Sequence, residues 1–357
     1  MLTMADYLAD RYESTGVRGL LAVLMLIFLV SMMGAQTIGG GVIFTTYTGA
    51  PEWVGIVVMG VTVMLYCMAG GIRSIMLTDL IQGILMVVTA VVTFFVSLKL
   101  GGGLEVINEK LAAMDTNYVS FPGHNNSYPW QGYVSMIVMW SFFAIGQPHL
   151  FTKFFTMKDH KTMFKAVILG TLGMWFSASF IEWCGVTGII SFPGLEGKQS
   201  DFVVPLILQG GLSPILSSLM IAGIFSAGMS TISSLLLTAT SAASRDLYQK
   251  ILKRNATDEE TLRLSKVITV CLGIIAIGIG IYKPGSIFQI VLFAYGGLGI
   301  WAAPILLGMY WRRTTTAAVY VGVISAEILY VLMVVKFTSW SFGFNPLIVA
   351  WAFCQWS

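Results

Sequence analysis

The sequence predicts an all-α, polytopic membrane protein, and three observations support this prediction. Hydrophobic residues make up 56% of the 357 residues and charged residues only 10%, against about a quarter charged in soluble proteins. The apolar residues form long continuous runs, and lysine and arginine are spread unevenly between the connections. A soluble enzyme, a nucleic-acid-binding protein and a disordered chain are disfavoured, because so few charged side chains cannot form a water-facing surface.

Ten apolar runs approach the roughly 20 residues that a membrane-spanning helix needs. Helices are expected because a backbone exposed to lipid must satisfy its own hydrogen bonds, and the short alternating segments of a barrel are not seen. The runs are 19–46, 53–71, 76–98, 131–152, 163–190, 213–243, 265–282, 286–311, 316–336 and one that starts near Phe344 and continues to Ser357. No low-complexity linker separates them, so a single membrane domain over 1–357 is expected.

The positive charges orient these runs. With the N-terminal segment in the cytoplasm, 15 of the 20 lysines and arginines fall in inner connections and 5 in outer ones, as the positive-inside rule requires. The inner residues are Arg11, Arg18, Arg73, Lys153, Lys158, Lys161, Lys165, Arg245, Lys250, Lys253, Arg254, Arg263, Lys266, Arg312 and Arg313. The outer ones are Lys99, Lys110, Lys198, Lys283 and Lys336. The most charged inner loop is expected at 245–264.

The cysteines and histidines are too scattered to predict a disulfide framework or a metal site. Single cysteines in apolar runs are expected to be small core residues: Cys67, Cys184, Cys271 and Cys354. The histidines are His124, His149 and His160. Because no set of His, Cys, Asp and Glu converges on one membrane face, enzymatic chemistry is disfavoured. A channel is disfavoured as well, since neither a selectivity filter nor a voltage-sensing arginine series is visible.

Acidic residues inside apolar runs are functional candidates by default. Asp79 opens the third run, where it either complements the helix dipole near the inner surface or serves as a cation station or gate partner. Glu182 and Glu327 lie deeper in the fifth and ninth runs. Each of these two is either a functional carboxylate or a neutral group hydrogen-bonded to a neighbouring helix.

The fourth run contains a helix-breaking sequence, Gly146-Gln147-Pro148, shortly after Trp140. Proline removes a backbone donor, and irregular backbone survives in a membrane only where protein or a water-filled cavity satisfies it. A discontinuous helix of this kind is typical of the binding site of a secondary transporter. A simple proline kink remains the alternative.

The sixth run carries a stripe of small and hydroxylated residues. Ala227, Ser230, Thr231 and Ser234 recur at i, i+3, i+4 and i+7, which places them on one face of a helix. The stripe either allows close helix packing, with hydroxyls bonded to the preceding turn, or offers hydroxyl and carbonyl oxygens to a hard cation such as Na⁺.

Four groups of residues, in order along the chain, resemble the motifs of the solute:sodium symporter family. They are Gly70–Arg73 with Thr78–Gln82, Gly146–His149 with Lys158-Asp159, the run Ala227–Tyr248, and Phe293–Gly299 with Leu307–Trp311. The likeness covers essentially the whole chain. Within the family the chain is most similar to the sodium/pantothenate branch, through Gly71–Arg73, Glu260–Thr269, Lys283-Pro284 and Gly343–Pro346.

The resemblance implies a LeuT-like transporter fold of two inverted five-helix repeats, with solute and Na⁺ bound near the midplane at broken helices. Residues 19–98 would correspond to core helices three to five, 131–311 to core helices six to ten, and 316–357 to incomplete C-terminal extra helices. Core helices one and two would be missing. A fragment truncated at both ends is therefore expected.

The resemblance also implies site residues. The Ala227 carbonyl with the Ser230 and Thr231 hydroxyls would bind Na⁺, and Asp79 with Ser233 or Ser234 would form a second cation station. Solute contacts are expected from Met32, Trp140, Ala144 and Ser234, and the small Ala144 beside Met32 would leave a roomy pocket.

The implied function is alternating-access symport of Na⁺ with a small organic carboxylate such as pantothenate, in the plasma (inner) membrane. One alternative is symport of proline or another amino acid. The other is that the chain is a non-transporting sensor or a degenerate fragment.

Overall fold

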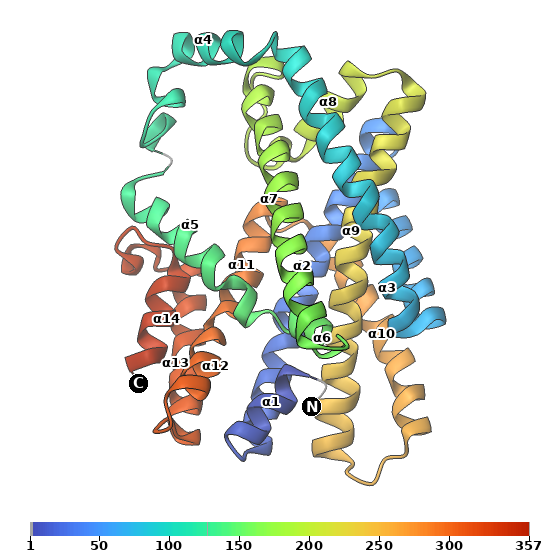
Figure 1. Cartoon of the computed structure of the whole chain (residues 1–357), viewed down its shortest axis with the longest axis vertical. Coiled ribbons are helices and arrows are strands. Elements are labelled where there is room, and N and C mark those ends of the chain that lie inside the picture. Colours follow the sequence, from blue (N-terminus) through green and yellow to red (C-terminus); the bar gives the residue numbers. More distant parts are fainter. Residues whose placement is uncertain (1–2, 127, 357) are drawn as a thin grey trace.

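The computed structural model describes residues 3–126 and 128–356, and at 71–74, 142–144, 338 and 356 it describes the backbone alone. In this part of the chain every regular element is a helix. Figure 1 shows the long helices running along the long axis of the molecule, with α4 and α8 near one end and α1 near the other. We call these the α4 end and the α1 end.

Eight helices of the described chain are long and apolar enough to cross a membrane. They are Thr15–Thr48, Glu52–Gly70, Ile75–Gly101, His160–Ser191, Pro214–Leu252, Asp258–Tyr282, Ile287–Tyr310 and Thr316–Val335. These match eight of the ten apolar runs, which confirms the all-helical membrane architecture. The other two runs form a broken helix and a short one.

Helices α1 (Met4–Arg11) and α2 (Thr15–Thr48) begin at hydroxyl caps, Thr3 and Ser14, whose side chains accept backbone N–H groups of the first turn. Helix α2 ends at Gly49, which adopts the left-handed conformation with φ 69°. It runs through the centre of the molecule and supplies many of the buried apolar side chains.

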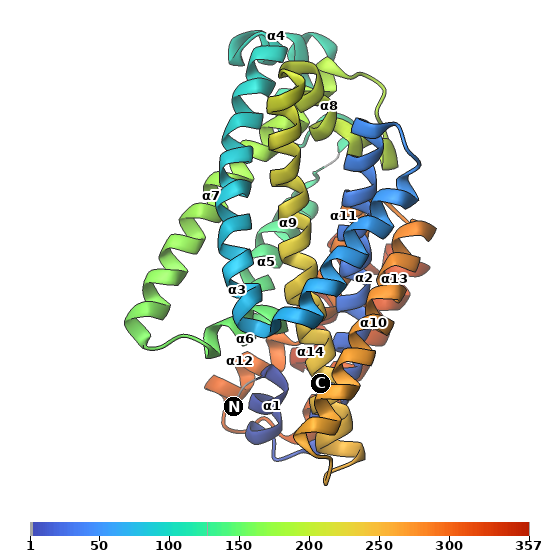
Figure 2. The same cartoon turned by 90° about the vertical axis from the view of Figure 1, so that its right-hand side faces the viewer.

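The second and third predicted spans form one continuous hydrogen-bonded helix, α3 (Glu52–Gly101). Its two legs, Glu52–Gly70 and Ile75–Gly101, run in opposite directions along the molecule and meet in a sharp bend at the α1 end (Figure 2). The separate inner loop expected around Arg73 is therefore wrong. The side chain of Arg73 lies outside the described residues.

The predicted break in the fourth run falls between two short helices. Helix α5 (Trp130–Phe143) is followed by the 3₁₀ turn η3 (Ala144–Gly146), the non-helical residue Gln147 and helix α6 (Pro148–Phe155). Helix α4 (Leu104–Met114) and the 3₁₀ turns η1 (Thr116–Val119) and η2 (His124–Asn126) connect α3 to α5.

Helix α7 (His160–Ser191) begins at the cap residue Asp159 and buries only residues near its end, Cys184, Thr187 and Gly188. Figure 2 shows its first half sloping away from the rest of the molecule. The 3₁₀ turn η4 (Gly197–Phe202) and helix α8 (Val203–Gly211) then return the chain to α9 (Pro214–Ser241).

Helix α9 continues without a loop into a π-helix, η5 (Ala242–Leu252). The charged loop expected at 245–264 is therefore wrong at both ends: residues up to Leu252 belong to η5 and residues from Asp258 belong to α10, so the turn covers only 253–257. Residues Ser244 and Asp246 are buried in η5. A tight turn leads to α10 (Asp258–Tyr282), which begins with a capping box formed by Thr257 and Glu260.

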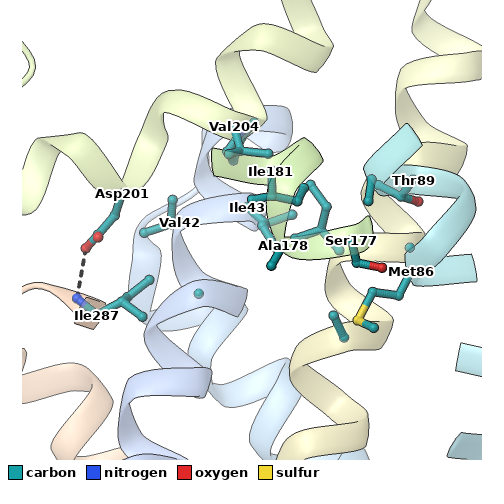
Figure 3. A pocket seen from close by; sticks show the side chains of 16 residues that line it. Val42, Ile43, Met86, Thr89, Ser177, Ala178, Ile181, Asp201, Val204 and Ile287 are labelled. Atoms are coloured by element: carbon teal, nitrogen blue, oxygen red, sulfur yellow. Dashed lines mark hydrogen bonds between the residues drawn. The ribbon is translucent and has the colours of Figure 1, made fainter. Parts of the chain in front are cut away.

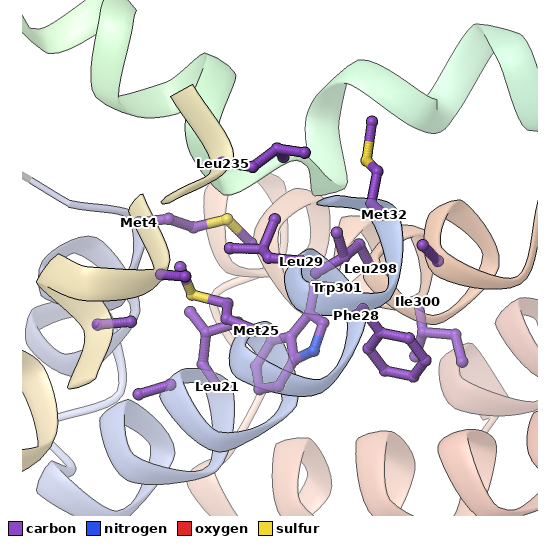
Figure 4. Close-up of a cluster of buried hydrophobic side chains, with 14 of the residues drawn as sticks. Met4, Leu21, Met25, Phe28, Leu29, Met32, Leu235, Leu298, Ile300 and Trp301 are labelled. Carbon is purple, nitrogen blue, oxygen red and sulfur yellow. The ribbon is translucent and has the colours of Figure 1, made fainter. Parts of the chain in front are cut away.

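The C-terminal part contains α11 (Ile287–Ile300), α12 (Ala302–Tyr310), α13 (Thr316–Val335), the 3₁₀ turn η6 (Thr338–Ser341) and α14 (Pro346–Trp356). The main core lies where α2 packs against α11 on one side and against α9 on another. Figure 4 shows Met25, Phe28, Leu235, Leu298 and Trp301 meeting there.

The cysteines divide between core and surface. Cys184 and Cys354 are buried and Cys67 is partly buried, as expected, but Cys271 is exposed on α10. The prediction that Cys271 is a core residue is wrong, because it lies on a face of α10 that no described helix covers.

Candidate functional site

The hydroxyl stripe on α9 brings three oxygen atoms together. The Ser230 and Thr231 hydroxyls both donate to the Ala227 carbonyl oxygen, each at 3.0 Å. Both side chains are partly buried. This bonding to the preceding turn is the packing role that the sequence left open. Each hydroxyl oxygen still keeps lone pairs, so the same atoms can act as ligands for a cation.

Helix α9 is closely held against its neighbours at this level. A Cβ atom at Gly228 would lie 2.8 Å from the Met59 side chain and 3.8 Å from the Gln36 carbonyl oxygen. The Tyr66 hydroxyl donates to the Met229 carbonyl oxygen at 3.0 Å. The stripe is thus fixed by α2 and by the first leg of α3.

One turn further along α9, two serines face an acidic residue. The Ser233 and Ser234 hydroxyls lie 3.4 Å from the two carboxylate oxygens of Asp79, on the second leg of α3. Lys153, on the second half of the broken helix, lies 3.1 Å from the same carboxylate. The structure thus brings together the residues expected for a second cation station and adds a lysine that sequence reasoning had counted only as a charge of an inner connection.

The bend in α3 bears on the two roles left open for Asp79. The second leg begins at Ile75, so Asp79 lies close to the start of that leg. The helix-dipole interpretation therefore stays open beside the role of a cation station or gate partner. The carboxylate also links three elements, α3, α6 and α9.

The two oxygen groups are connected by a shared hydroxyl. The Ser233 hydroxyl is 2.9 Å from the Ser230 carbonyl oxygen and 3.4 Å from Asp79. A hydroxyl has a single proton, so it donates to one of the two at a time. These contacts connect five neighbouring residues in space, in the order Ala227, Ser230, Ser233, Asp79 and Lys153. We call this series the polar ladder.

The broken helix lies directly against α11. A Cβ atom at Gly146 would overlap the Leu298 carbonyl oxygen and lie 3.0 Å from the Gly299 Cα. Only glycine permits this approach. The irregular backbone of the break is thereby buried against protein, as such backbone requires within a membrane.

The residues expected to contact solute lie in different surroundings. Trp140 is exposed on one side and packs edge-on against Tyr295, with ring centroids 5.9 Å apart. Met32 is 1% exposed and lies in the main core (Figure 4). Ser234 faces Asp79. The side chain of Ala144 lies outside the described residues.

Two cavities lie beside α9, at different levels along the helix. One of about 410 Å³ is lined by Ala227 and Gly223 together with residues of α2, α3, α7 and α8, and Figure 3 shows Val42, Ile43, Thr89 and Ser177 around it. Another of about 210 Å³ is lined by Pro148 and Thr152 of the break, Thr238 and Ser241 of α9, and residues of α1 and α2. The Asp79 contacts lie at an intermediate level of α9.

An acidic residue also lines the larger cavity. Asp201 accepts a hydrogen bond from the backbone N–H of Ile287 at 3.3 Å (Figure 3). Burial raises the pKa of the Asp201 carboxyl, and the charge of Glu52 acts in the same direction. The Ile287 N–H and Lys283 oppose this shift. Lys283 itself is paired with Glu52 at 3.0 Å.

The other two acidic candidates differ in burial. Glu182 is exposed on α7. Glu327 is only 5% exposed, and its carboxylate oxygens have no hydrogen-bond partner in the described chain. Over the same residues, no group of three His, Cys, Asp or Glu side chains is placed to hold a metal ion. Any bound cation would therefore rely on hydroxyl and carbonyl oxygens with a single carboxylate.

Sequence reasoning missed Tyr66 and Lys153. Tyr66 carried no signal, because an aromatic residue in an apolar run resembles any other core residue. Lys153 carried a weak signal, since it follows the break by less than two helical turns, but its partner is far away in sequence.

Comparisons with known proteins agree with these features. The protein-family model described as "Sodium:solute symporter family" matches residues 1–325 of the chain. The chain is 29% identical over 349 residues to the sodium/pantothenate symporter of Escherichia coli (strain K12), which covers 97% of this chain and 72% of that protein. It is 29% identical over 316 residues to the sodium/pantothenate symporter of Haemophilus influenzae, covering 87% of this chain and 64% of that protein.

A proline transporter and a solved structure are similar as well. The high-affinity proline transporter PutP of Bacillus subtilis (strain 168) is 26% identical over 332 residues, covering 90% of this chain and 68% of that protein. A substrate-bound, outward-open structure of a Na⁺-coupled sialic acid symporter superimposes with a TM-score of 0.78 at 18% identity. This match covers 99% of this chain and 75% of that one, and it supports the expected LeuT-like fold.

Proposed function

The chain belongs to the sodium:solute symporter family, and from that premise we propose that it carries a small organic carboxylate, pantothenate in the first place, together with Na⁺. The family consists of sodium-coupled, multi-pass membrane transporters and not of enzymes, and Na⁺ is the coupling ion. The proposal places the chain in the plasma membrane with its α1 end in the cytoplasm, where the positive charges of the connections gather.

The observation that carries the proposal is the polar ladder between the two cavities. It combines a backbone carbonyl, several hydroxyls and one carboxylate, the oxygen ligands that a hard monovalent cation accepts. Ala227, Ser230 and Thr231 would form one Na⁺ site, and Asp79 with Ser233 and Ser234 a second. Coordination by the Ala227 carbonyl oxygen would displace at least one of the two hydroxyl protons that it now accepts.

Asp79 gives a physical route from ion binding to conformational change. Its carboxylate is paired with Lys153 on the second half of a broken helix, so Na⁺ and the lysine ammonium would compete for the same charge. Na⁺ arriving at Asp79 would weaken the link between α6 and α3. Coupling follows if ion and solute together favour one conformation over the other. At 100 mV, inside negative, each Na⁺ that enters contributes about 2.3 kcal/mol before its concentration gradient is counted.

The proposed solute contacts are Trp140, Met32, Ala144 and Ser234. Pantothenate is favoured because the two pantothenate symporters have the higher identity and because the small residue Ala144 would leave space for a solute larger than an amino acid. Proline is the second candidate, supported by the similarity to the proline transporter. In this assignment, 19–98 form core helices three to five and 131–311 core helices six to ten.

The test is uptake of labelled pantothenate and labelled proline into proteoliposomes under an inward Na⁺ gradient. Pantothenate uptake that collapses when Na⁺ is replaced by choline supports the proposal. Uptake of proline alone would support proline symport, the second candidate. Uptake of neither solute would contradict symport by this chain.

A further inference from the structure

Two polar side chains at the helix break are buried without partners. Gln147 is 0% exposed, and neither its side-chain nitrogen nor its oxygen has a hydrogen-bond partner in the described chain. His149, two residues later, is 9% exposed, and its Nδ1 also has none. The transport mechanism above gives these side chains no role.

Such a concentration of unpaired groups needs a physical reason. Each buried polar group without a partner costs about 1–3 kcal/mol, and most buried polar atoms in proteins are paired. Here three unpaired atoms flank Pro148, which lines the 210 Å³ cavity together with Thr152. Gly146 fixes the same segment against α11, so the side chains of the break do not have the freedom of a surface loop.

The kind of partner follows from the hydrogen-bonding capacity of the two side chains. The Gln147 amide has two donors and one acceptor, and a neutral histidine offers one of each. A carboxylate only accepts hydrogen bonds and would leave the Gln147 oxygen unpaired, whereas an ammonium only donates and would leave the amide nitrogen unpaired. The nearby lysine of α6, Lys153, is already paired with Asp79. An uncharged group that both donates and accepts fits the site.

We propose that Gln147 and His149 form a subsite that binds a hydroxyl group of the transported solute, the simplest uncharged group that both donates and accepts. This inference rests on the proposed function and narrows the solute class to hydroxylated acids. Pantothenate carries two hydroxyl groups, while proline carries none. The 210 Å³ cavity lies beside Pro148, between the two side chains in sequence, and is also lined by Thr3 and Met4 at the α1 end.

The experiment compares two solutes that differ only in the proposed contact. Binding of labelled pantothenate, and of its analogue with both hydroxyls replaced by hydrogen, is measured on the purified chain in NaCl, with choline chloride as the blank. The wild type should bind pantothenate at least about tenfold more tightly than the deoxy analogue. Gln147→Leu should lose most of that preference while its affinity for the analogue stays within about twofold.

His149→Phe tests the second side chain in the same way, and His149→Gln should retain part of the preference because it keeps a donor and an acceptor. Gln209→Leu on α8 and His160→Phe on α7 are matched exposed controls and should bind both solutes as the wild type does. Stabilisation of each variant by NaCl, measured as the shift in Tm, checks that the variant is folded.

Three results would overturn the subsite: an unchanged preference in Gln147→Leu, an equal loss of affinity for both solutes, or binding of proline but not pantothenate by the wild type. A wild type that binds neither pantothenate nor proline in NaCl contradicts the proposed function itself. That result is distinct from a failure of the subsite alone.

Discussion

Lys153 and Asp79 form an ion pair, with the Nζ and carboxylate oxygen atoms 3.1 Å apart, that ties the second half of the broken helix to α3. The two residues are 74 positions apart in sequence. The same carboxylate faces two serines of α9. A single acidic group therefore links three helices.

Removing the acidic partner should weaken Na⁺ binding. Asp79→Asn keeps the size of the side chain but loses the charge that attracts a cation, so the Na⁺ concentration for half-maximal solute uptake should rise about tenfold or more. The measurement is initial uptake rate against Na⁺ concentration. Asp159→Asn, on an exposed cap of α7, is the control. Wild-type Na⁺ dependence in Asp79→Asn would remove the residue from the cation path.

Removing the basic partner should have the opposite effect. Lys153→Met frees the Asp79 carboxylate from its internal cation, so Na⁺ should bind more tightly, by about threefold to tenfold. The side chain of Lys153 is 43% exposed, and solvent screening limits the effect. Na⁺-dependent protection against heat denaturation reports this affinity without transport. Weaker Na⁺ binding in Lys153→Met would contradict the competition.

The hydroxyl stripe on α9 leads to a separate prediction about Na⁺ binding. Ser230→Ala and Thr231→Ala should each raise the Na⁺ requirement for uptake about tenfold, because each removes one oxygen from the group around the Ala227 carbonyl. Ser218→Ala is a matched control on α9, since that hydroxyl makes the same kind of bond, to Pro214, on an exposed face. If all three variants behave alike, the stripe serves packing alone.

The close approach of the break to α11 predicts a steric effect. Gly146→Ala would force its Cβ into the Leu298 carbonyl and should destabilise the protein by about 1–3 kcal/mol, with loss of uptake. Thermal unfolding in detergent measures this loss. Gly170→Ala on α7, where nothing lies within 4 Å of an added Cβ, should leave both stability and uptake unchanged.

The Asp201 carboxyl should make the stability of the folded protein depend on pH. Burial raises the pKa of this carboxyl in the folded protein, so the folded state holds the proton more tightly than the unfolded state. Its contribution to the free energy of unfolding is therefore full below the unfolded pKa and is lost as the pH rises through the raised folded pKa. Asp201→Asn stays neutral and can still accept from the Ile287 N–H.

In a series of thermal melts from acidic to neutral pH, Asp201→Asn should consequently lose less stability than the wild type as the pH rises. Glu105→Gln, on the exposed face of α4, should follow the wild-type curve. An identical pH profile for Asp201→Asn and the wild type would show that this carboxyl contributes nothing to the dependence.

The sequence by itself determined the features that depend on local chemistry. Runs of apolar residues specify helices because a backbone in lipid must bond internally. The spacing of Ala227, Ser230 and Thr231 places them on one helix face because a helix has a fixed period, and proline marks the break because it has no N–H.

Only the tertiary structure decided which of these features meet. It placed Lys153 beside Asp79, joined the second and third spans into one bent helix and left the Gln147 side chain buried without a partner. Contacts between residues far apart in the chain depend on how helices pack, and one apolar face resembles another.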